Sequence, residues 1–340
     1  MAHSCQLQAS LHKNFTVCAI HNPLLCNIFA KSTFLADGKC HLPQVCIFPA
    51  TIIKLSILTI QTAFTYITGA IGDLYDAREA ANIAHIVLEH ITGMNKLDRL
   101  VHKTKLLTPN QNTQLKAAIE ALQRLEPVQY ITGIGWFYGM ELLVNHHVLI
   151  PRPETEELVE WIVQDAGHRP SLHILDIGTG SGCIPLALKK SLPPAQVSAV
   201  DVSPDALEVA SGNASRLRLD VNFQLMDALN PQQMATLPTF DIIVSNPPYI
   251  TQSEKSTMQQ QVWGFEPSLA LFVPDQDALL FYRHITQFAA TRLSAGGALY
   301  FEINESLGKE VVALMENNGF KEVLLKQDMF GKDRMVKGKI

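Results

Sequence analysis

The chain has 340 residues, of which 47% are hydrophobic and 17% charged, so it can bury a substantial core and is long enough for two domains. Its 27 basic and 32 acidic residues give a formal net charge of −5, without the basic excess expected of a protein that binds mainly phosphate backbones. Five of the six cysteines lie in the first 46 residues, with neither zinc-site spacing nor the distribution of a disulfide framework. We therefore expect a reducing, cytoplasmic location.

Residues 1–56 differ in composition from the rest and are predicted to form a poorly ordered N-terminal extension. They contain no arginine, a single acidic residue and no sustained helical or strand period. The apolar stretch 45–60 is interrupted by Pro49 and Lys54 and falls short of the about 20 residues that span a bilayer. Scarce acidic residues are typical of transit peptides, but those favour arginine, and the first arginine is Arg78. The alternative is an artefactual start upstream of the true one.

Helical patterns begin near residue 57 and predict a small helical bundle domain over residues 57–128. In a first helix, Asp76 and Glu79 have the spacing of a capping box, and Gly93 suits the C-terminal cap. The apolar residues expected on its buried face are Ile83, Ile86, Val87 and Ile91.

A second helix is expected to begin at Thr108, with Gln111 reaching back to it, and to end before Pro127. Its predicted buried stripe consists of Leu115, Ile119, Leu122 and Leu125. Residues 129–151 follow, where glycines alternate with aromatic residues, and we expect a hairpin that links this domain to the next.

From residue 152 to residue 340, strand and helix patterns alternate, which predicts an α/β domain with a doubly wound parallel sheet. The parallel strands are expected at residues 172–177, 196–201, 221–227, 240–245 and 298–303. A final pair, 322–327 and 334–337, surrounds a turn and should form an antiparallel hairpin at the sheet edge.

The first of these strands joins the next helix through a loop with glycine at every second position. Glycines let a ligand approach the backbone, and the helix that follows offers free N–H groups. A dinucleotide fingerprint is not satisfied, because Cys183 stands where that pattern requires glycine or alanine. An acidic residue just upstream favours an amino-bearing ligand, and Asp201 after the second strand can accept both hydroxyls of a ribose. The pattern indicates S-adenosylmethionine and not NAD, bound by Asp176, Gly178, Thr179, Gly180, Ser181, Gly182 and Asp201.

Asp227, after the third strand, is predicted to approach the adenine, although an Asp in this position is as often a cap. His173 lies within the first strand, and we assign it no role.

The fourth strand ends in Asn246, Pro247, Pro248 and Tyr249. The Asn side-chain oxygen and a proline carbonyl are neighbouring acceptors that suit an –NH2 group, without a competing proline N–H. The aromatic ring provides an apolar wall suited to a planar amide or an exocyclic amine. Taken alone, the four residues are more typical of a simple turn than of a binding site.

Two of these motifs, with the segment Pro151-Arg-Pro-Glu-Thr-Glu156, resemble the HemK/PrmC family, the protein N(5)-glutamine methyltransferases that act on peptide chain release factors. The resemblance runs from about residue 57 to the C-terminus. Asn-Pro-Pro-Tyr is shared with amino-methylating DNA and rRNA enzymes. Three other segments narrow the resemblance to the release factor enzymes: the Pro-Arg-Pro segment, Phe265-Glu-Pro267 and the turn Phe330-Gly-Lys-Asp-Arg334.

The resemblance implies a class I S-adenosylmethionine-dependent methyltransferase fold, with a Rossmann-like seven-stranded sheet and an N-terminal helical bundle that docks the substrate. It implies that the loop 178–182 cradles the methionine part of the cofactor and that Asp201 holds its ribose. Many relatives place a Trp at the position of Ala228 to pack on adenine, so Leu229 is the candidate substitute. No metal, membrane or nucleic-acid partner is expected, and the partner is a class 1 release factor.

The resemblance further implies that residues 246–249 hold the substrate glutamine, with Asn246 also near the cofactor. Asn246 Oδ1 and the Pro247 carbonyl can each accept one N–H of the amide, fixing its nitrogen in line with the sulfonium methyl. Tyr249 would pack over that nitrogen, and no general base is required. Arg152 and Glu154 are predicted at the glutamine pocket; alternatively, Glu154 and Glu156 are only dipole partners of a helix start.

Two other functions remain open. An N(6)-adenine DNA or N(2)-guanine RNA methyltransferase would use the same acceptors, although a DNA enzyme needs a basic recognition region and room for a flipped base. A non-catalytic module that binds S-adenosylmethionine and docks the release factor is the alternative of another class. The intact loop glycines, Asp201 and Asn246 argue against it.

Overall fold

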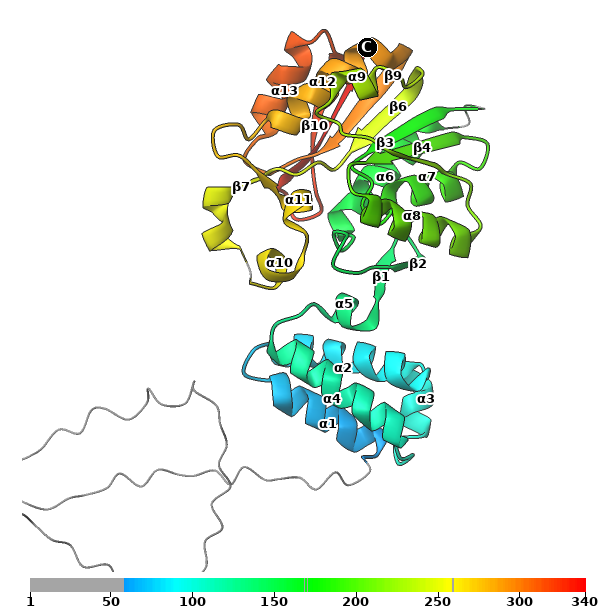
Figure 1. The fold of residues 1–340 in the computed structure, drawn as a ribbon, viewed down its shortest axis with the longest axis vertical. Helices are drawn as coiled ribbons and strands as arrows, with labels where there is room; N and C mark the ends of the chain where they lie inside the picture. The colour runs from blue at the N-terminus through cyan, green and yellow to red at the C-terminus, as the bar shows by residue number, and fades with distance from the viewer. Residues whose placement is uncertain (1–57, 168, 170, 259) are drawn as a thin grey trace, which may run out of the picture. The chain divides into compact units, whose positions relative to one another are not determined.

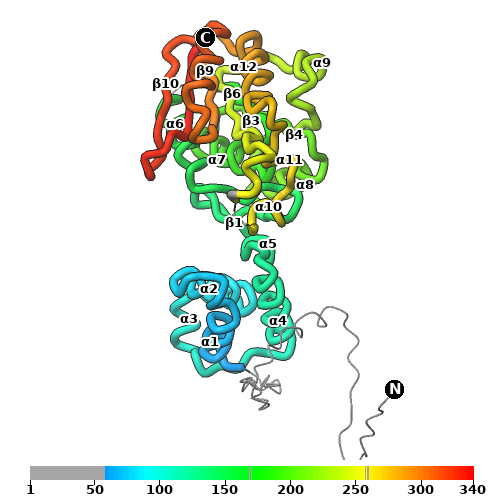
Figure 2. Tube along the Cα trace, turned by 90° about the vertical axis from the view of Figure 1, so that its left-hand side faces the viewer, coloured from blue at the N-terminus to red at the C-terminus, as the bar shows by residue number. Residues whose placement is uncertain are grey.

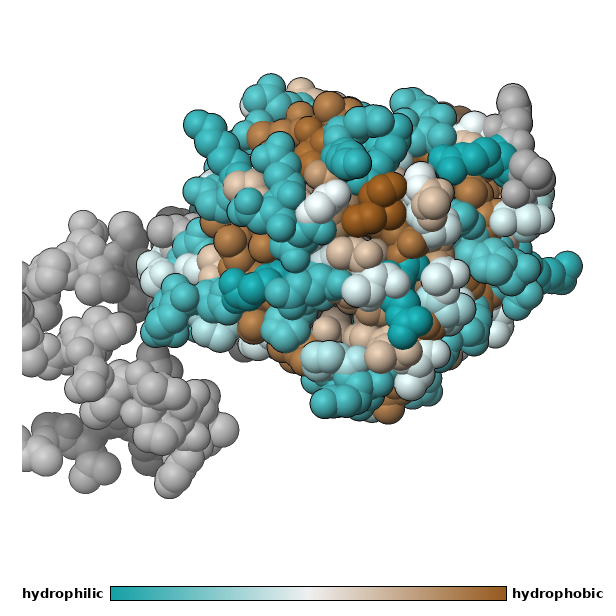
Figure 3. Space-filling model, turned by 90° about the horizontal axis from the view of Figure 1, so that it is seen from above, coloured by the Kyte–Doolittle hydropathy of each residue, from teal (hydrophilic) through white to brown (hydrophobic). Residues whose placement is uncertain are grey.

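The computed structural model describes residues 58–340 apart from 168, 170 and 259, so the predictions for residues 1–56 lie outside it. Hydrophilic side chains cover much of the face shown in Figure 3. Within the described part, no helix is both long and apolar enough to cross a membrane.

The first described segment is a set of helices with its own apolar core, drawn in blue to green in Figure 1. The predicted first helix is α2, in which Asp76 Oδ1 accepts from the N–H groups of Arg78 and Glu79, and Gly93 ends it at a φ of 65°. One assignment is wrong, since Ile86 is 44% exposed and lies off the buried face. The helices are α1 (Ile60–Ile71), α2 (Ala77–Thr92), α3 (Lys96–Val101), α4 (Pro109–Gln123) and α5 (Val128–Thr132).

The second predicted helix is α4, and its capping box between Thr108 and Gln111 is present in both directions. The helix ends at Gln123, earlier than predicted. Leu125 therefore lies beyond it, at a φ of 66°, and its N–H donates to the Leu122 carbonyl. The chain turns before Pro127 because this left-handed residue closes the helix.

The predicted hairpin consists of β1 (Ile134–Phe137) and β2 (Met140–Leu143), which pair antiparallel. Its turn residues Tyr138 and Gly139 both have positive φ, which is the type I′ geometry that matches strand twist. The hairpin is held by the Asn213 side chain, which accepts from the Leu143 N–H and donates to the Leu143 carbonyl.

The central sheet has seven strands in the order β10-β11-β9-β6-β3-β4-β5. The parallel strands are β3 (His173–Ile177), β4 (Gln196–Asp201), β5 (Asn222–Leu225), β6 (Phe240–Ser245) and β9 (Leu293–Glu302). The antiparallel edge hairpin is β10 (Lys321–Gln327) with β11 (Asp333–Lys339), and β11 pairs with β9. The doubly wound sheet is thus confirmed, although β5 is shorter than predicted and β9 begins earlier.

Helices cover both faces of this sheet (Figure 1). Alternate residues of a strand face opposite layers: Ile242 and Val244 of β6 pack into one core, and Ile243 packs into the other. The first layer contains α6 (Pro153–Ala166), α7 (Cys183–Ser191) and α8 (Pro204–Leu217), and the second contains α9 (Pro231–Met234), α12 (Leu280–Arg292) and α13 (Gly308–Asn317). The strand order reverses between β3 and β6, which is where a doubly wound sheet opens a crevice.

Several short elements form an insertion between β6 and α12, of which α10 and α11 are labelled in Figure 2. The sequence patterns did not predict regular structure in this segment. It contains β7 (Ile250–Thr251), the 3-10 helix η2 (Gln252–Thr257), α10 (Gln260–Phe265), α11 (Ser268–Leu271) and β8 (Phe272–Val273). β7 and β8 pair in parallel, which brings the two ends of the insertion together.

Candidate functional site

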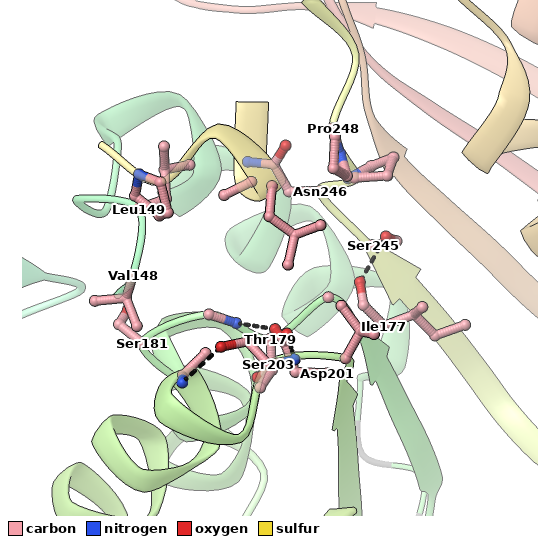
Figure 4. Close-up of a pocket in the computed structure, with 18 of the residues that line it drawn as sticks. Val148, Leu149, Ile177, Thr179, Ser181, Asp201, Ser203, Ser245, Asn246 and Pro248 are labelled. Carbon is pink, nitrogen blue, oxygen red and sulfur yellow. Dashed lines mark hydrogen bonds between the residues drawn. The ribbon is translucent and has the colours of Figure 1, made fainter. Parts of the chain in front are cut away.

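A cavity opens at the carboxyl ends of β3, β4 and β6, at the reversal of strand order (Figure 4). It is lined by residues of the segment 146–152 and Thr155 of α6, by the glycine loop after β3, by the loops after β4 and β5, by the residues that follow β6, and by Phe281 and Ile285 of α12. The insertion adds Pro267, Leu269 and Ala270. The predicted cofactor and acceptor motifs therefore lie on one cavity.

The glycine loop adopts a backbone that few other residues could follow. Gly178, Gly180 and Gly182 have φ of 77°, 53° and 80°. A Cβ at Gly178 or Gly180 would meet no protein atom within 4 Å, so these positions leave open space for a ligand. A Cβ at Gly182 would lie 3.1 Å from the Ala210 Cβ, so that glycine serves the packing of α7 on α8.

Asp201 connects the glycine loop to the loop after β4. Its Oδ2 accepts from the Gly180 N–H at 2.9 Å, and its Oδ1 accepts from the Ser203 N–H at 2.9 Å (Figure 4). A carboxylate has about four acceptor sites, so both oxygens can still accept from ribose hydroxyls.

Asp176 lies fully buried near the end of β3, two residues before Gly178, and does not line the cavity itself. Among the described residues, neither of its carboxylate oxygens has a hydrogen-bond partner, and the hydroxyls of Thr179 and Ser181 also lack one. Burial raises the pKa of Asp176 to about 7, partly opposed by the nearby Thr179 hydroxyl and reinforced by Asp201. An unpaired buried carboxylate is unfavourable, so a ligand that brings a positive amino group to this end of the cavity would relieve it.

Asn246 follows β6 directly and lines the cavity with Pro247 and Pro248 (Figure 4). The strand end is fixed because the Ser245 hydroxyl donates to the Ile177 carbonyl at 2.6 Å. Asn246 Nδ2 donates to Thr155 Oγ1 at 3.3 Å, and among the described residues its Oδ1 has no hydrogen-bond partner. An acceptor is thus left available beside the cavity.

Tyr249 lies differently from its neighbours. It lines a second, smaller cavity with Asn246 and Glu302 and not the main one, and its ring packs against the second sheet core. Burial raises the pKa of its hydroxyl above the usual range, so the group stays neutral.

The predicted adenine end contains Asp227 and Ala228, both of which line the cavity. Asp227 also forms an Asx-turn, because its Oδ1 accepts from the Leu229 N–H at 2.8 Å, whereas the N-cap of α9 is Asn230. Leu229, the expected substitute for a Trp, does not line the cavity, whereas Phe281 of α12 does. No local pattern marks Phe281, which only the packing of α12 brings to this site.

Arg152 lines both cavities and forms an ion pair with Glu266 at 2.5 Å. This contact joins two of the segments that carry the family resemblance. Glu156 Oε1 accepts from the Tyr138 N–H at 2.8 Å, so it holds the hairpin turn, and Glu154 lines neither cavity. Of the two residues predicted at the glutamine pocket, only Arg152 lies on a cavity wall.

Sequence reasoning missed Thr155 and Glu302. The Thr155 hydroxyl lies 2.6 Å from Glu302 Oε2, and both residues are buried. Burial raises the pKa of Glu302 to about 7. Across the described part of the chain, no group of three or more His, Cys, Asp or Glu side chains is arranged to hold a metal ion.

Two family models and several known proteins are similar to this chain. The family model described as PrmC N-terminal domain matches residues 66–133, and that described as Methyltransferase small domain matches residues 155–263. A "Release factor glutamine methyltransferase" of Flavobacterium psychrophilum is 43% identical over 283 residues, covering 82% of this chain and 99% of the relative. One of Bacteroides thetaiotaomicron is 41% identical, covering 80% and 96%. A solved release-factor-specific protein-(glutamine-N5) methyltransferase of Alicyclobacillus acidocaldarius is 26% identical, covers 56% and 93%, and superposes with a TM-score of 0.35.

Proposed function

Because this chain belongs to the family of release factor glutamine methyltransferases, we propose that it transfers a methyl group from S-adenosylmethionine to the glutamine side-chain nitrogen in the Gly-Gly-Gln motif of class 1 peptide chain release factors. The observation that carries the proposal is the single cavity shared by the glycine loop and Asn246, whose Oδ1 has no hydrogen-bond partner among the residues that the structure describes. The enzyme is a methyltransferase whose seven-stranded Rossmann-like sheet follows an N-terminal helical domain.

The residues of the main cavity fit the proposed cofactor. S-adenosylmethionine supplies an electrophilic methyl group on a sulfonium when bound. Gly178 and Gly180 leave space beside their backbone, and Asp201 retains acceptor sites for ribose hydroxyls. The buried Asp176 carboxylate, which has no hydrogen-bond partner in the described part of the chain, favours a positive amino group nearby. Phe281 and Ala228 provide apolar surface at the adenine end.

For the acceptor amide, the residues after β6 act by positioning. An amide nitrogen is a weak nucleophile because its lone pair is delocalised into the carbonyl. Asn246 Oδ1 and the Pro247 carbonyl each accept one N–H, which holds the nitrogen in a fixed direction, and such alignment can contribute several kcal/mol, about 7 or more in well-oriented systems. The proton leaves to water after the N–C bond has formed, so no general base is assigned.

The N-terminal helices, residues 57–128, are proposed to dock the release factor, and residues 129–151 to link them to the catalytic domain, 152–340. Arg152 and Glu154 remain the proposed glutamine-pocket residues, with Arg152 the better supported because it lines both cavities. The cytoplasmic location stays a prediction.

The test is to incubate the protein with a purified class 1 release factor and labelled S-adenosylmethionine, then locate the label by mass spectrometry. We expect one methyl group on the Gly-Gly-Gln glutamine and none on a release factor in which that glutamine is replaced by glutamate. A methylated oligonucleotide beside an unmodified factor would favour the nucleic-acid enzyme. Calorimetric binding of the cofactor without transfer to either would favour the non-catalytic module.

A further inference from the structure

Three side chains from three separate elements form a hydrogen-bonded chain behind the acceptor site. In the sheet, Ser245 of β6 is paired with Phe301 of β9, so Asn246, which follows β6, and Glu302, the last residue of β9, come side by side at this edge. Thr155 in the first turn of α6 lies between them. Its hydroxyl donates to Glu302 Oε2 at 2.6 Å and accepts from Asn246 Nδ2 at 3.3 Å.

The direction of these hydrogen bonds determines how the Asn246 amide is turned. An ionised carboxylate only accepts, so the single proton of the Thr155 hydroxyl is directed at Glu302. The hydroxyl then has only lone pairs left for Asn246, which must present its NH2 group. A flipped amide would place Oδ1 against these lone pairs, leaving two acceptors in contact without a proton.

We propose that Glu302 and Thr155 are positioning residues, which hold the Asn246 amide with Oδ1 free to accept an N–H of the substrate amide. This inference rests on the function proposed above. It assigns a role to two buried polar residues that the transfer reaction itself does not use. Glu302 acts on the Asn246 amide through Thr155 and through a direct interaction with that amide, and Thr155 acts through Asn246.

The charge on Glu302 decides whether the amide is held. A protonated Glu302 could itself donate to Thr155, which could then donate to Asn246 Oδ1, and the flipped amide would become acceptable. Burial raises the pKa of Glu302 to about 7, and Glu154 adds to this, whereas the Thr155 hydroxyl, Arg334 and Asn246 lower it. The titratable groups that face Glu302 are Glu154 on α6, Cys183 on α7, Tyr249 after β6, Tyr282 on α12 and Arg334 on β11. The ordered amide therefore exists above about pH 7 and is lost as the pH falls.

Two substitutions remove the chain at different links, and a third preserves it. Thr155→Val removes the hydroxyl at nearly constant volume, Glu302→Gln removes the fixed acceptor, and Thr155→Ser keeps the hydroxyl. We expect kcat to fall about 10- to 100-fold in Thr155→Val and Glu302→Gln, because the acceptor loses its alignment. Thr155→Ser should stay within about 3-fold of wild type, and calorimetric cofactor affinity should stay within about 3-fold in all three.

Further measurements separate positioning from a general structural role. Thr155→Val combined with Glu302→Gln should be no slower than the slower single variant, because both act on one chain. The kcat of wild type should fall below about pH 7, and Glu302→Gln should lose this dependence, although both proteins keep Asp176. The inference would be overturned if Thr155→Val had the same kcat as wild type. It would also be overturned if cofactor affinity and kcat fell in parallel in the variants.

The amide can also be observed without turnover, which separates this inference from the proposed function. In protein labelled with 15N-asparagine, the Asn246 side-chain signal is identified by its absence in Asn246→Ala. We expect it to shift between pH 8 and pH 6 in wild type and not in Glu302→Gln. An unchanged signal across pH in wild type contradicts the inference, whereas failure of wild type to methylate the release factor contradicts only the proposed function.

Discussion

The guanidinium of Arg152 lies 2.5 Å from a carboxylate oxygen of Glu266, a residue 114 positions further along the chain. The Glu266 side chain is only 1% exposed, whereas that of Arg152 is 34% exposed. Burial is the main influence on Glu266 and raises its pKa, while Arg152 opposes that shift. Arg152 therefore partly compensates the charge of the buried Glu266 carboxylate, and Arg152 itself lines both cavities.

Removing only the cation of this pair should destabilise the fold. Arg152→Met retains the length of the side chain but leaves the Glu266 carboxylate buried without its partner. We expect the free energy of unfolding to fall by about 2–4 kcal/mol. This is at or below the loss usually seen when one partner of a buried ion pair is removed, because Arg152 is partly exposed. Urea unfolding measures it, with Arg152→Met plus Glu266→Gln as the matched control. If the double variant is no more stable than the single one, the buried charge is not the cause.

Asp176 should make the stability of the cofactor-free enzyme fall as the pH rises. Its pKa is about 7 in the folded protein against 3.8 in the unfolded chain, so the folded state binds the proton more tightly in between. The contribution of Asp176 to stability is therefore greatest below pH 4, and it declines as the pH rises to about 7. We expect Asp176→Asn to be more stable than wild type at pH 8 and similar at pH 4, by urea unfolding. If the free energies of unfolding of Asp176→Asn and wild type differed by the same amount at pH 4 and pH 8, the carboxylate would already be paired in the folded protein.

The same substitution should weaken cofactor binding, because it removes the charge that favours a positive amino group. We expect at least about a 10-fold increase in the calorimetric Kd of S-adenosylmethionine, equivalent to about 1.4 kcal/mol. Binding that is unaffected in Asp176→Asn would remove Asp176 from the cofactor site.

Asn246→Ala should nearly abolish turnover while cofactor binding largely survives. The side chain aligns the acceptor nitrogen, and misplacing a reacting atom can reduce the rate about 100-fold or more. Single-turnover methylation and calorimetry together test this. Comparable losses in both would mean that Asn246 is chiefly a cofactor ligand.

Two loop glycines should respond differently to alanine. Both positions need a left-handed backbone, which is unfavourable for alanine by about 1–2 kcal/mol. At Gly180 the added methyl group enters open space of the cavity, so cofactor affinity should fall more than stability. At Gly182 it meets Ala210 at 3.1 Å and Leu186 at 3.3 Å, so the melting temperature should fall further than in Gly180→Ala. The reverse order would contradict the separate roles given to the two glycines.

Features that depend only on neighbouring residues could be predicted from the sequence. The capping box of Thr108 and Gln111, the bounds of β4 and β6 and the strand-loop-helix context of the glycine loop all follow from local signals, and the structure contains them. Local signals were insufficient where a helix face or end had to be placed exactly. Ile86 fits the apolar spacing of α2 yet is exposed, and Leu125 lies past the end of α4.

Which distant side chains meet at the site depends on how the strands and helices pack, and it could not be predicted from local patterns. Thr155 and Glu302 are 147 positions apart in the sequence. They touch because β9 lies beside β6 and the first turn of α6 lies next to the ends of both strands. Phe281 reaches the cavity for a similar reason, through the packing of α12 on the sheet. Hydrophobic periodicity reveals that a strand or helix exists and which residues it buries. It contains no information on the order of strands in the sheet, and that order brings a threonine, a carboxylate and an amide into one hydrogen-bonded chain.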